Sequence, residues 1–406
     1  MIALVDCNNF FVSAERVFDP SLKHKSVAVL SSNDGCIIAR SNDIKPVIPM
    51  GVPVFKVRDT LKQHGVVLKS SNFALYSDMS RRVMATLARL TPQLDAYSID
   101  EAFLEWPGTY TPEAVRQTVH RDTGIPISIG VASTRTLAKA ATELAKHGNN
   151  ALDFTGMNEA DIDQHLCRLP VGEVWGVGSK LAPFFRTRRI FTAYDLKTLP
   201  EGMRRQYPIT VCRVISELRG QPTDHHAPLH PKSMISTRSF DQPVYDQSAI
   251  SAALCSHGAH LGIKLRKAQL TASSIEAFVS TGKKEGRYST ACTLSMPTND
   301  TRKLIQAIKM MVSRLYTPGL SYKKAGVMVA RLSPVQQLTL DSNEAALHHG
   351  EKINTAVDAI NQKWGARAIR FADEVGSKEG NISATPQQTF RSPRYTTVWK
   401  ELKKVT

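Results

Sequence analysis

Apolar and polar positions in the first part of the chain follow two periods, one typical of strands and one of helices. Residues 73–90 repeat apolar side chains at three- and four-residue steps, which predicts a helix with one buried face. Residues 21–30 predict a further strand, and residues 36–57, with three prolines, predict a small, irregular subdomain. With residues 19–70 treated as an insertion, the remaining order is β-α-β-β-α-β plus one more helix. The predicted elements are strand 1–6, helix 73–90, strands 93–99 and 102–106, helix 112–122, strand 125–132 and helix 134–147.

The same order of periods returns after residue 232. These elements are strand 233–240, helix 248–266, strands 270–280 and 288–296, helix 301–316 and strand 323–332. Asn299 and Asp300 are capping candidates for the helix that starts at residue 301. The pattern therefore predicts an α+β, multidomain chain with two split, ferredoxin-like βαββαβ units and a helical segment between them, at about 159–220.

The chain changes character at about residue 373, where it becomes polar and rich in turn-forming residues. This composition predicts a flexible tail. Its end, VWKELKKV, places Val398, Trp399, Leu402 and Val405 where they could form the apolar face of a short docking helix.

Length and charge narrow the class of protein. With 406 residues the chain is too long for one ordinary core. Lysine and arginine exceed aspartate and glutamate by 52 − 36 = 16, which favours a polyanionic partner, although a solvated basic surface has the same composition. Six scattered cysteines without a CxxC pair argue against a zinc ribbon or a disulfide scaffold. No apolar run approaches the roughly 20 residues of a membrane span and no basic leader precedes MIALVD, so we expect a soluble intracellular protein without a membrane partner.

Asp100 and Glu101 are adjacent acids inside an otherwise apolar run. Neighbouring residues of a regular strand point to opposite faces, so these two can share a target only at a distorted hairpin tip. Asp6 ends another apolar strand, which can lie beside that hairpin. Three converging carboxylates suit hard divalent cations and predict two Mg²⁺ ions for phosphoryl transfer. The alternative is a solvated turn with Asp6 as a strand-end residue.

Two further features bear on this choice. Lys139 and Lys146 are seven residues apart on one helical face, where either could reach a triphosphate, or both could be solvated. Phe10 and Phe11 follow Asp6, where a ring could pack against a nucleotide sugar; core packing is the alternative, which we favour for Phe10.

The motifs LVDCNNFFVSAE, SNDGCIIAR, LYSDMS, YSIDEAF, SIGVASTRTLAKAATELAK and VWGVGSK occur in this order. Together they resemble the Y-family translesion DNA polymerases, most closely the UmuC branch, the catalytic subunits of bacterial DNA polymerase V. SPRYTT near the C-terminus resembles the UmuC tail. The resemblance covers nearly the whole chain, and its ordered set of motifs is specific.

The resemblance implies roles for individual residues. Asp6 and Asp100 match the metal-ligand aspartates, Glu101 is the third carboxylate, and Cys7 matches a main-chain carbonyl ligand. Phe11 matches the steric gate, an aromatic ring that would collide with a ribose 2′-OH.

Other matched positions bind nucleotide or DNA. Phe10 lies at the nucleotide, and Lys45 and Lys146 match cations that contact the triphosphate. Four positions are expected to contact DNA, namely Gly176, Gly178, Lys180 and Arg238. Without the resemblance, Gly176 and Gly178 have two readings, a phosphate site at a helix N-terminus and a tight helix–helix turn.

By the same resemblance the chain is a right-hand polymerase with small fingers. Its expected domains are a palm (1–18 and 71–165), fingers (19–70), a helix-hairpin-helix thumb (166–231), a little finger (232–345) and a C-terminal region with the tail (346–406). Small fingers supply little of the induced fit that rejects mismatches, so error-prone synthesis is expected.

The implied setting is translesion synthesis in the SOS response of a bacterial cytoplasm. The expected partners are primer-template DNA, a dNTP, a processed UmuD dimer and the RecA filament. Gln337, Leu338 and Leu340 resemble a sliding-clamp peptide, but Asp341 replaces its final aromatic anchor, so weak clamp binding is expected. Asn42 also departs from the family, since many members have a phosphate-binding tyrosine there.

Two other classes of protein compete with this interpretation. A DNA-binding scaffold without useful catalysis would keep the fold and the basic surface, but it has no need of three converging acids. A two-metal nuclease or nucleotidyl cyclase would explain the acids but not Phe11 or the second βαββαβ unit. Nucleotide-dependent primer elongation separates the three.

Overall fold

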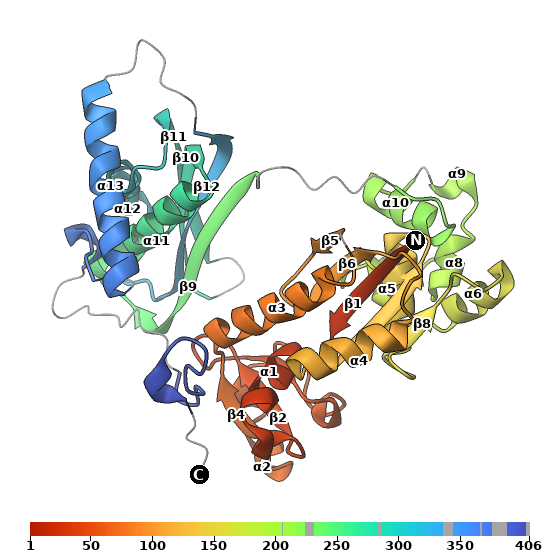
Figure 1. The fold of residues 1–406 in the computed structure, drawn as a ribbon. Coiled ribbons are helices and arrows are strands. Elements are labelled where there is room, and N and C mark those ends of the chain that lie inside the picture. Colours follow the sequence, from red (N-terminus) through yellow and green to blue (C-terminus); the bar gives the residue numbers. More distant parts are fainter. Residues whose placement is uncertain are drawn as a thin grey trace. The chain divides into compact units, whose positions relative to one another are not determined.

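A computed structural model of the chain divides into two compact units (Figure 1). The first is Met1–His225 together with Gln387–Thr406, and the second is His226–Pro386. The structure describes residues 1–91, 93–204, 206–223, 231–282, 286–335, 344–365, 368–375 and 388–402. No helix within these ranges is both long and apolar enough to cross a membrane.

The first unit is built on a five-stranded sheet in the order β5-β6-β1-β7-β8. Its strands are β1 (Ile2–Cys7), β5 (Leu94–Ala96), β6 (Glu101–Glu105), β7 (Ile127–Ala132) and β8 (Ala151–Asp153). β1 runs antiparallel to β6 on one side and to β7 on the other. The predicted βαββαβ arrangement is confirmed, with its first strand between the third and the fourth. β8, which pairs in parallel with β7, was not predicted.

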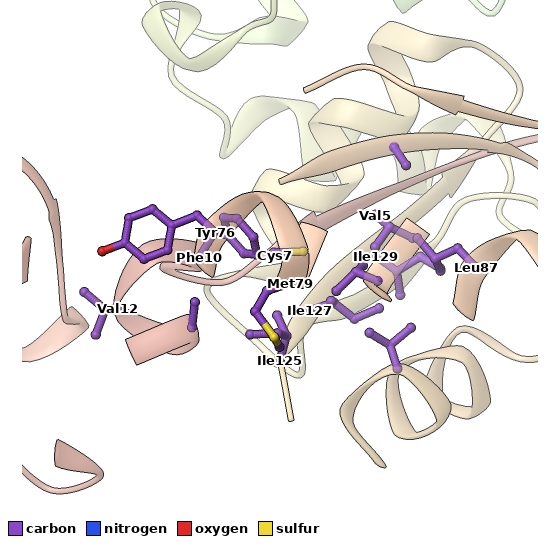
Figure 2. Close-up of a cluster of buried hydrophobic side chains, with 14 of the residues drawn as sticks. Val5, Cys7, Phe10, Val12, Tyr76, Met79, Leu87, Ile125, Ile127 and Ile129 are labelled. Carbon is purple, nitrogen blue, oxygen red and sulfur yellow. The ribbon is translucent and has the colours of Figure 1, made fainter. Parts of the chain in front are cut away.

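Helices cover both faces of this sheet. On one face are α1 (Phe10–Phe18), α3 (Phe73–Ala88) and α4 (Pro112–Thr123), and on the other is α5 (Arg135–Ala145). Figure 2 shows the core that α1, α3 and α4 cover, with side chains from β1, β7, α1 and α3. The predicted apolar face of residues 73–90 lies in this core. α1 was not predicted, since the fully buried Glu15 interrupts its apolar pattern.

The alternation of side chains along β1 places Asp6 on the α5 side of the sheet. Val5 points into the core of Figure 2, whereas Leu4 is buried in a second core that contains residues of α5. Because neighbouring strand residues point to opposite faces, Asp6 leaves the sheet on the same side as Leu4. It therefore faces α5, the helix that carries Lys139 and is followed by the C-cap residue Lys146.

Gly130 in β7 allows α5 to lie close to the sheet. A Cβ atom there would stand 2.3 Å from the main-chain nitrogen of Thr142 and 2.5 Å from the carbonyl oxygen of Ala138. Because both atoms belong to the helix backbone, Gly130→Ala is expected to lower the free energy of unfolding by about 3 kcal/mol. Chemical denaturation tests this, with Gly156→Ala as control, since a Cβ at Gly156 meets nothing within 4 Å. Equal midpoints for the two variants would show that α5 can move away at little cost.

Residues 19–70 contain a small sheet with its own core; the strand predicted within 21–30 is confirmed, whereas residues 36–57, expected to be irregular, contribute a second strand. The sheet has the order β3-β2-β4, and one helix accompanies it. The elements are β2 (Val27–Leu30), β3 (Ile37–Arg40), α2 (Arg58–Gln63) and β4 (Val67–Ser70). Buried apolar side chains from these strands, α2 and the connecting turns form the core.

The predicted helical segment packs on the α5 side of the central sheet, in the second core. Its helices are α6 (Glu159–Cys167), α7 (Leu181–Arg186), α8 (Ala193–Lys197), α9 (Glu201–Arg204) and α10 (Ile209–Leu218). The first of them begins before residue 166, the expected start of this domain.

The second unit has the predicted order of elements but its own strand order. Its elements are β9 (Ser233–Val244), α11 (Gln247–Lys267), β10 (Leu270–Ser280), β11 (Arg287–Thr298), α12 (Thr301–Leu315), β12 (Tyr322–Pro334) and α13 (Glu344–Trp364). The sheet order is β11-β10-β12-β9, so the first strand lies at an edge here and not in the middle. Asp300 caps α12 as predicted, by accepting a hydrogen bond from the N–H of Arg302.

Helix α13 continues the second unit past residue 345. The guanidinium of Arg266 donates to both carboxylate oxygens of Asp358, at 2.7 and 2.9 Å. The amide of Asn354 donates to Asp300 at 3.0 Å. Residues 344–364 are therefore tied to α11 and α12, and the expected single C-terminal region at 346–406 is divided between the two units.

The segment 388–402 corrects the prediction of a flexible tail. It belongs to the first unit, where Arg391 forms a β-bridge with Ser70 and the side chains of Ser392 and Tyr395 are buried. In Figure 1 this segment is dark blue and lies beside β4. The predicted docking helix is only a 3-10 turn, Trp399–Glu401, with Trp399 88% exposed. Val405 lies outside the described residues.

Candidate active site

The three acids predicted from the sequence lie at one end of the central sheet. Asp6 and Glu101 are directly opposite each other in the antiparallel pair β1–β6, so their side chains share a face. The N–H of Cys7 donates to the main-chain carbonyl of Asp100 at 2.8 Å, which joins the end of β1 to the hairpin tip. The structure thus brings Asp6, Asp100 and Glu101 together.

The hairpin tip departs from a regular strand at Ser98–Asp100, as the adjacent acids predicted. The hydroxyl of Ser98 accepts hydrogen bonds from the N–H groups of Asp100 and Glu101, at 3.2 and 3.0 Å. The same hydroxyl donates to Oδ1 of Asp100 at 2.6 Å. This turn holds Asp100 just before β6, whose first residue is Glu101.

Each of two acids is paired with a lysine from α5 or its C-cap. Lys139 donates to both carboxylate oxygens of Glu101, at 2.9 and 3.0 Å. Lys146 donates to Asp6 at 3.1 Å and to Glu143 at 2.9 Å. The seven-residue spacing predicted a shared face for the two lysines but not these two separate pairs.

The carboxyl of Asp6 is held in an unfavourable environment for a negative charge. Burial raises the pKa of Asp6 to about 7; Lys146 opposes this rise and the nearby Glu101 adds to it. Although burial acts against it, the charges of Asp6 and Glu143 raise the pKa of Lys146. The site therefore requires positive charge beside Asp6.

The donor atoms at this position fit a hard divalent cation. Carboxylate oxygens and a main-chain carbonyl are the ligands that Mg²⁺ prefers. The side chain of Cys7 is buried in the core of Figure 2, so only its main chain is available at the site. Burial, followed by the charges of Asp6, Asp100 and Glu101, raises the pKa of the Cys7 thiol, as expected where three acids surround one strand end.

A separate group of potential ligand atoms lies on the surface near the C-terminal end of α5. Oxygen or nitrogen atoms of Glu143, His147 and Glu173 are within 4.8 Å of one another. Glu143 is already engaged by Lys146. Exposed acidic clusters are common, and we assign no site to this one.

Lys45 lies close enough to Lys146 and Asp6 to interact with both electrostatically, and its triphosphate contact stays a prediction. It directly follows a 3-10 turn at Asn42–Ile44. Burial, and then the positive charges of Lys146 and Arg40, lower the pKa of Lys45. Lys45, which follows this turn, and Lys146, the C-cap residue of α5, therefore both lie near Asp6, an arrangement suited to a polyphosphate.

Asn42, which stands where many family members have tyrosine, makes a different contact. Its side-chain oxygen accepts a hydrogen bond from Asn9 at 3.0 Å. Asn9 adopts a left-handed conformation, with φ of 48°, and occupies the N-cap position of α1 without a side-chain capping hydrogen bond. The asparagine pair thus links the start of α1 to the small sheet's turn.

Phe11 and Phe10 point to different surroundings. The ring of Phe11 stacks on Tyr76, with centroids 4.4 Å apart, and meets the edge of Phe73. Phe10 is only 3% exposed and lies in the core of Figure 2. Core packing is therefore the correct interpretation of Phe10, and its assignment to nucleotide binding is not retained.

Two residues behind Phe11 were missed from the sequence. The hydroxyl of Tyr76 donates to the carboxylate of Glu15 at 2.9 Å. Neither Tyr76 nor Glu15 was predicted to contribute to the site. Only the pairing of α1 with α3 reveals that both lie behind the ring of Phe11.

The expected DNA-contacting positions lie in both units. Gly176, with φ of +86°, and Gly178 form a tight turn before α7, and Lys180 ends that turn in an exposed position. The DNA contact of these glycines stays a prediction. Arg238 pairs in register with Ala325, which is buried in the core of the second unit. The side chain of Arg238 therefore points to the face of the sheet that α11 and α12 cover. This orientation does not favour the predicted contact with DNA.

The predicted clamp-binding residues Gln337, Leu338 and Leu340 lie outside the described residues.

Two models of one protein family match this chain. The impB/mucB/samB family matches residues 5–143, and its C-terminal domain matches residues 231–342. A domain of unknown function, DUF4113, matches residues 351–405.

Known relatives extend the match to the full chain. Protein UmuC of Salmonella typhimurium is 35% identical over 100% of both chains, and Protein SamB of the same organism is 34% identical over 99% of both. DNA polymerase IV 1 of Mesorhizobium japonicum is 26% identical over 91% of this chain and 85% of its own.

A solved structure, "Insertion ternary complex of Dbh DNA polymerase", shares the fold, with a TM-score of 0.53 and 17% identity over 82% of this chain and 100% of that chain. These matches agree with the expected right-hand polymerase fold. This chain therefore belongs to the impB/mucB/samB family, within the UmuC branch of the Y-family DNA polymerases.

Proposed function

We propose that this chain is a template-directed, error-prone DNA polymerase that performs translesion synthesis in the SOS response of the bacterial cytoplasm. The observation that carries the proposal is the convergence of Asp6, Asp100 and Glu101 at one sheet end, opposite the cations Lys45 and Lys146. A nucleotidyl transfer site needs acids for metal ions and cations for a triphosphate within reach of each other.

Asp6, Asp100, Glu101 and the carbonyl of Cys7 would hold two Mg²⁺ ions. When bound, such ions lower the pKa of the attacking hydroxyl and neutralise the charge of the leaving diphosphate. Lys146 and Lys45 would bind the triphosphate oxygens and orient the reacting phosphate.

Phe11 would form the wall that rejects a 2′-hydroxyl. Its ring is supported from behind by Tyr76, which keeps the wall in place.

The proposed domains follow the family pattern. The central sheet with residues 1–18 and 71–165 would be the palm, residues 19–70 the fingers, the helical segment 166–231 the thumb and residues 232–345 the little finger. The net charge of +16 supports binding of primer-template DNA along its phosphates. The turn at Gly176 and Gly178 would contribute to that grip.

Partners are proposed from the family alone. A processed UmuD dimer and the RecA filament would be partners of the chain, and a sliding clamp would bind weakly because Asp341 replaces the aromatic anchor.

Primer extension tests the proposed function. The full chain is incubated with a primed template, Mg²⁺ and dNTPs, with and without processed UmuD and RecA filament. We expect elongation that follows the template sequence and stops when Mg²⁺ is chelated. Retained DNA binding without elongation under any partner condition would favour a scaffold, and shortening of the DNA would favour a nuclease.

A further inference from the structure

The segment 388–402 is bound to the end of β4 by three hydrogen bonds, one of them between main-chain atoms. The N–H of Ser70 donates to the carbonyl of Phe390 at 3.1 Å, and the N–H of Phe390 donates to the hydroxyl of Ser70 at 2.9 Å. The amide of Gln388 donates to the carbonyl of Ser71 at 3.0 Å. The segment thus runs alongside the residues that lead into α3.

Ser392 then connects α1 to the start of α3. Its side chain is 3% exposed, and its hydroxyl donates to Oε1 of Glu15 at 3.0 Å. The amide of Asn72 donates to the same hydroxyl at 3.0 Å. Asn72 also caps α3 by accepting a hydrogen bond from the N–H of Leu75. Through these hydrogen bonds Ser392 positions both the side chain of Glu15 and the first turn of α3.

Glu15 passes this constraint to Tyr76 and Phe11. It is 0% exposed, and its Oε1 accepts from both Ser392 and Tyr76. A buried carboxylate needs such donors, since its desolvation is costly. Burial also raises the pKa of Glu15, although both hydroxyls oppose the rise. The ring that Glu15 holds, Tyr76, is the one on which Phe11 stacks.

Tyr395 provides a second, apolar anchor on α1. It is buried, and its ring stacks on Phe18 with centroids 5.0 Å apart and planes 13° from parallel. An ion pair between Arg394 and Glu401 holds the turn that follows. The segment therefore has two anchors, Ser392 and Tyr395, on the helix that begins with Phe10 and Phe11.

We propose that residues 388–402, part of the match to the domain of unknown function, act as an intramolecular strap that holds Tyr76 and thereby the sugar-excluding ring of Phe11. Ser392, Glu15 and Tyr76 are positioning residues, since Phe11 is the group that would touch the nucleotide. The consequence for sugar selectivity rests on the proposed polymerase function. The consequence for the order of α1 and α3 does not.

Ser392→Ala in the full chain tests the strap. Without its hydroxyl, Glu15 loses one of two donors, so amide hydrogen exchange in α1 and in the first turn of α3 is expected to accelerate roughly tenfold. The ratio of kcat/KM for a dNTP to that for the matching rNTP is expected to fall about threefold to tenfold, with little change in dNTP incorporation itself. Thr397→Ala removes an exposed hydroxyl from the same segment and should change neither quantity.

A second pair of variants separates anchoring from general loss of fold. Tyr395→Ala should accelerate exchange in α1 as Ser392→Ala does, whereas Tyr395→Phe keeps the stacked ring and should restore wild-type protection. Unchanged exchange in both Ser392→Ala and Tyr395→Ala would overturn the strap. Faster exchange with an unchanged sugar ratio would overturn its link to Phe11. A wild-type chain that incorporates no nucleotide would refute the proposed function, and the exchange data would still decide whether the strap exists.

Discussion

Asp100→Asn is expected to reduce template-directed nucleotide incorporation by roughly a thousandfold, equivalent to about 4 kcal/mol of transition-state stabilisation. Asparagine keeps an oxygen that can accept from the Ser98 hydroxyl, and the main-chain carbonyl that accepts from Cys7 is untouched. The variant therefore removes a charge while the turn that positions it remains. Single-turnover primer extension at saturating dNTP measures the effect.

Asp95→Asn is a matched control, because Asp95 lies on the other strand of the same hairpin, opposite Phe103, and its carboxylate is paired with Arg135. It should extend primers like the wild type. The melting temperature and DNA affinity of Asp100→Asn should also match the wild type. A parallel loss of DNA binding or stability would show that Asp100 is a structural acid and not a metal ligand.

The elements with strong periodicity were predictable from the sequence, but strand order was not. Both units show the predicted βαββαβ order, yet the first strand is central in one sheet and at the edge in the other. The periodicity of apolar residues indicates which face of a strand or helix is buried. It does not indicate which other strand of the sheet a given strand will pair with. All strand pairs of the second sheet are antiparallel, so the segments that connect its strands are compatible with more than one strand order.

The candidate site was predictable where the residues themselves are unusual. Adjacent acids in an apolar run marked Asp100 and Glu101, because burial of two carboxylates needs a reason. The pairing of Lys139 with Glu101, and of Lys146 with Asp6, depends on how closely α5 approaches β1. That approach is set by packing around Gly130, which no local pattern reveals.

The strap was mispredicted because its stabilising contacts are not local. Ser392 and Glu15 are 377 residues apart in the sequence, and each looks like an ordinary surface residue. The polar composition of residues after 373 predicted disorder, since it offers few apolar side chains to bury. Here short polar side chains satisfy a buried acid instead, and a single ring, Tyr395, supplies the apolar anchor.

Phe11→Ala is expected to lower discrimination against ribonucleotides by roughly a hundredfold, or about 2.7 kcal/mol. An aromatic ring excludes a 2′-hydroxyl by steric collision only if the ring is held in place. Tyr76 and Phe73 hold the ring of Phe11 by packing against it in a stacked and an edge-on arrangement. The methyl group of alanine leaves that space open. The ratio of kcat/KM for each dNTP to that for its matching rNTP measures the effect.

Phe191→Ala, which removes an exposed ring from the helical segment, is the control and should leave the ratio unchanged. If Phe11→Ala lowers both rates equally, Phe11 only supports packing and the wall lies elsewhere. The strap adds a stricter condition. Because Ser392 acts on the sugar only through Tyr76 and Phe11, Ser392→Ala should shift the ratio in the same direction by less. In the absence of the Phe11 ring, Ser392→Ala should then shift it no further.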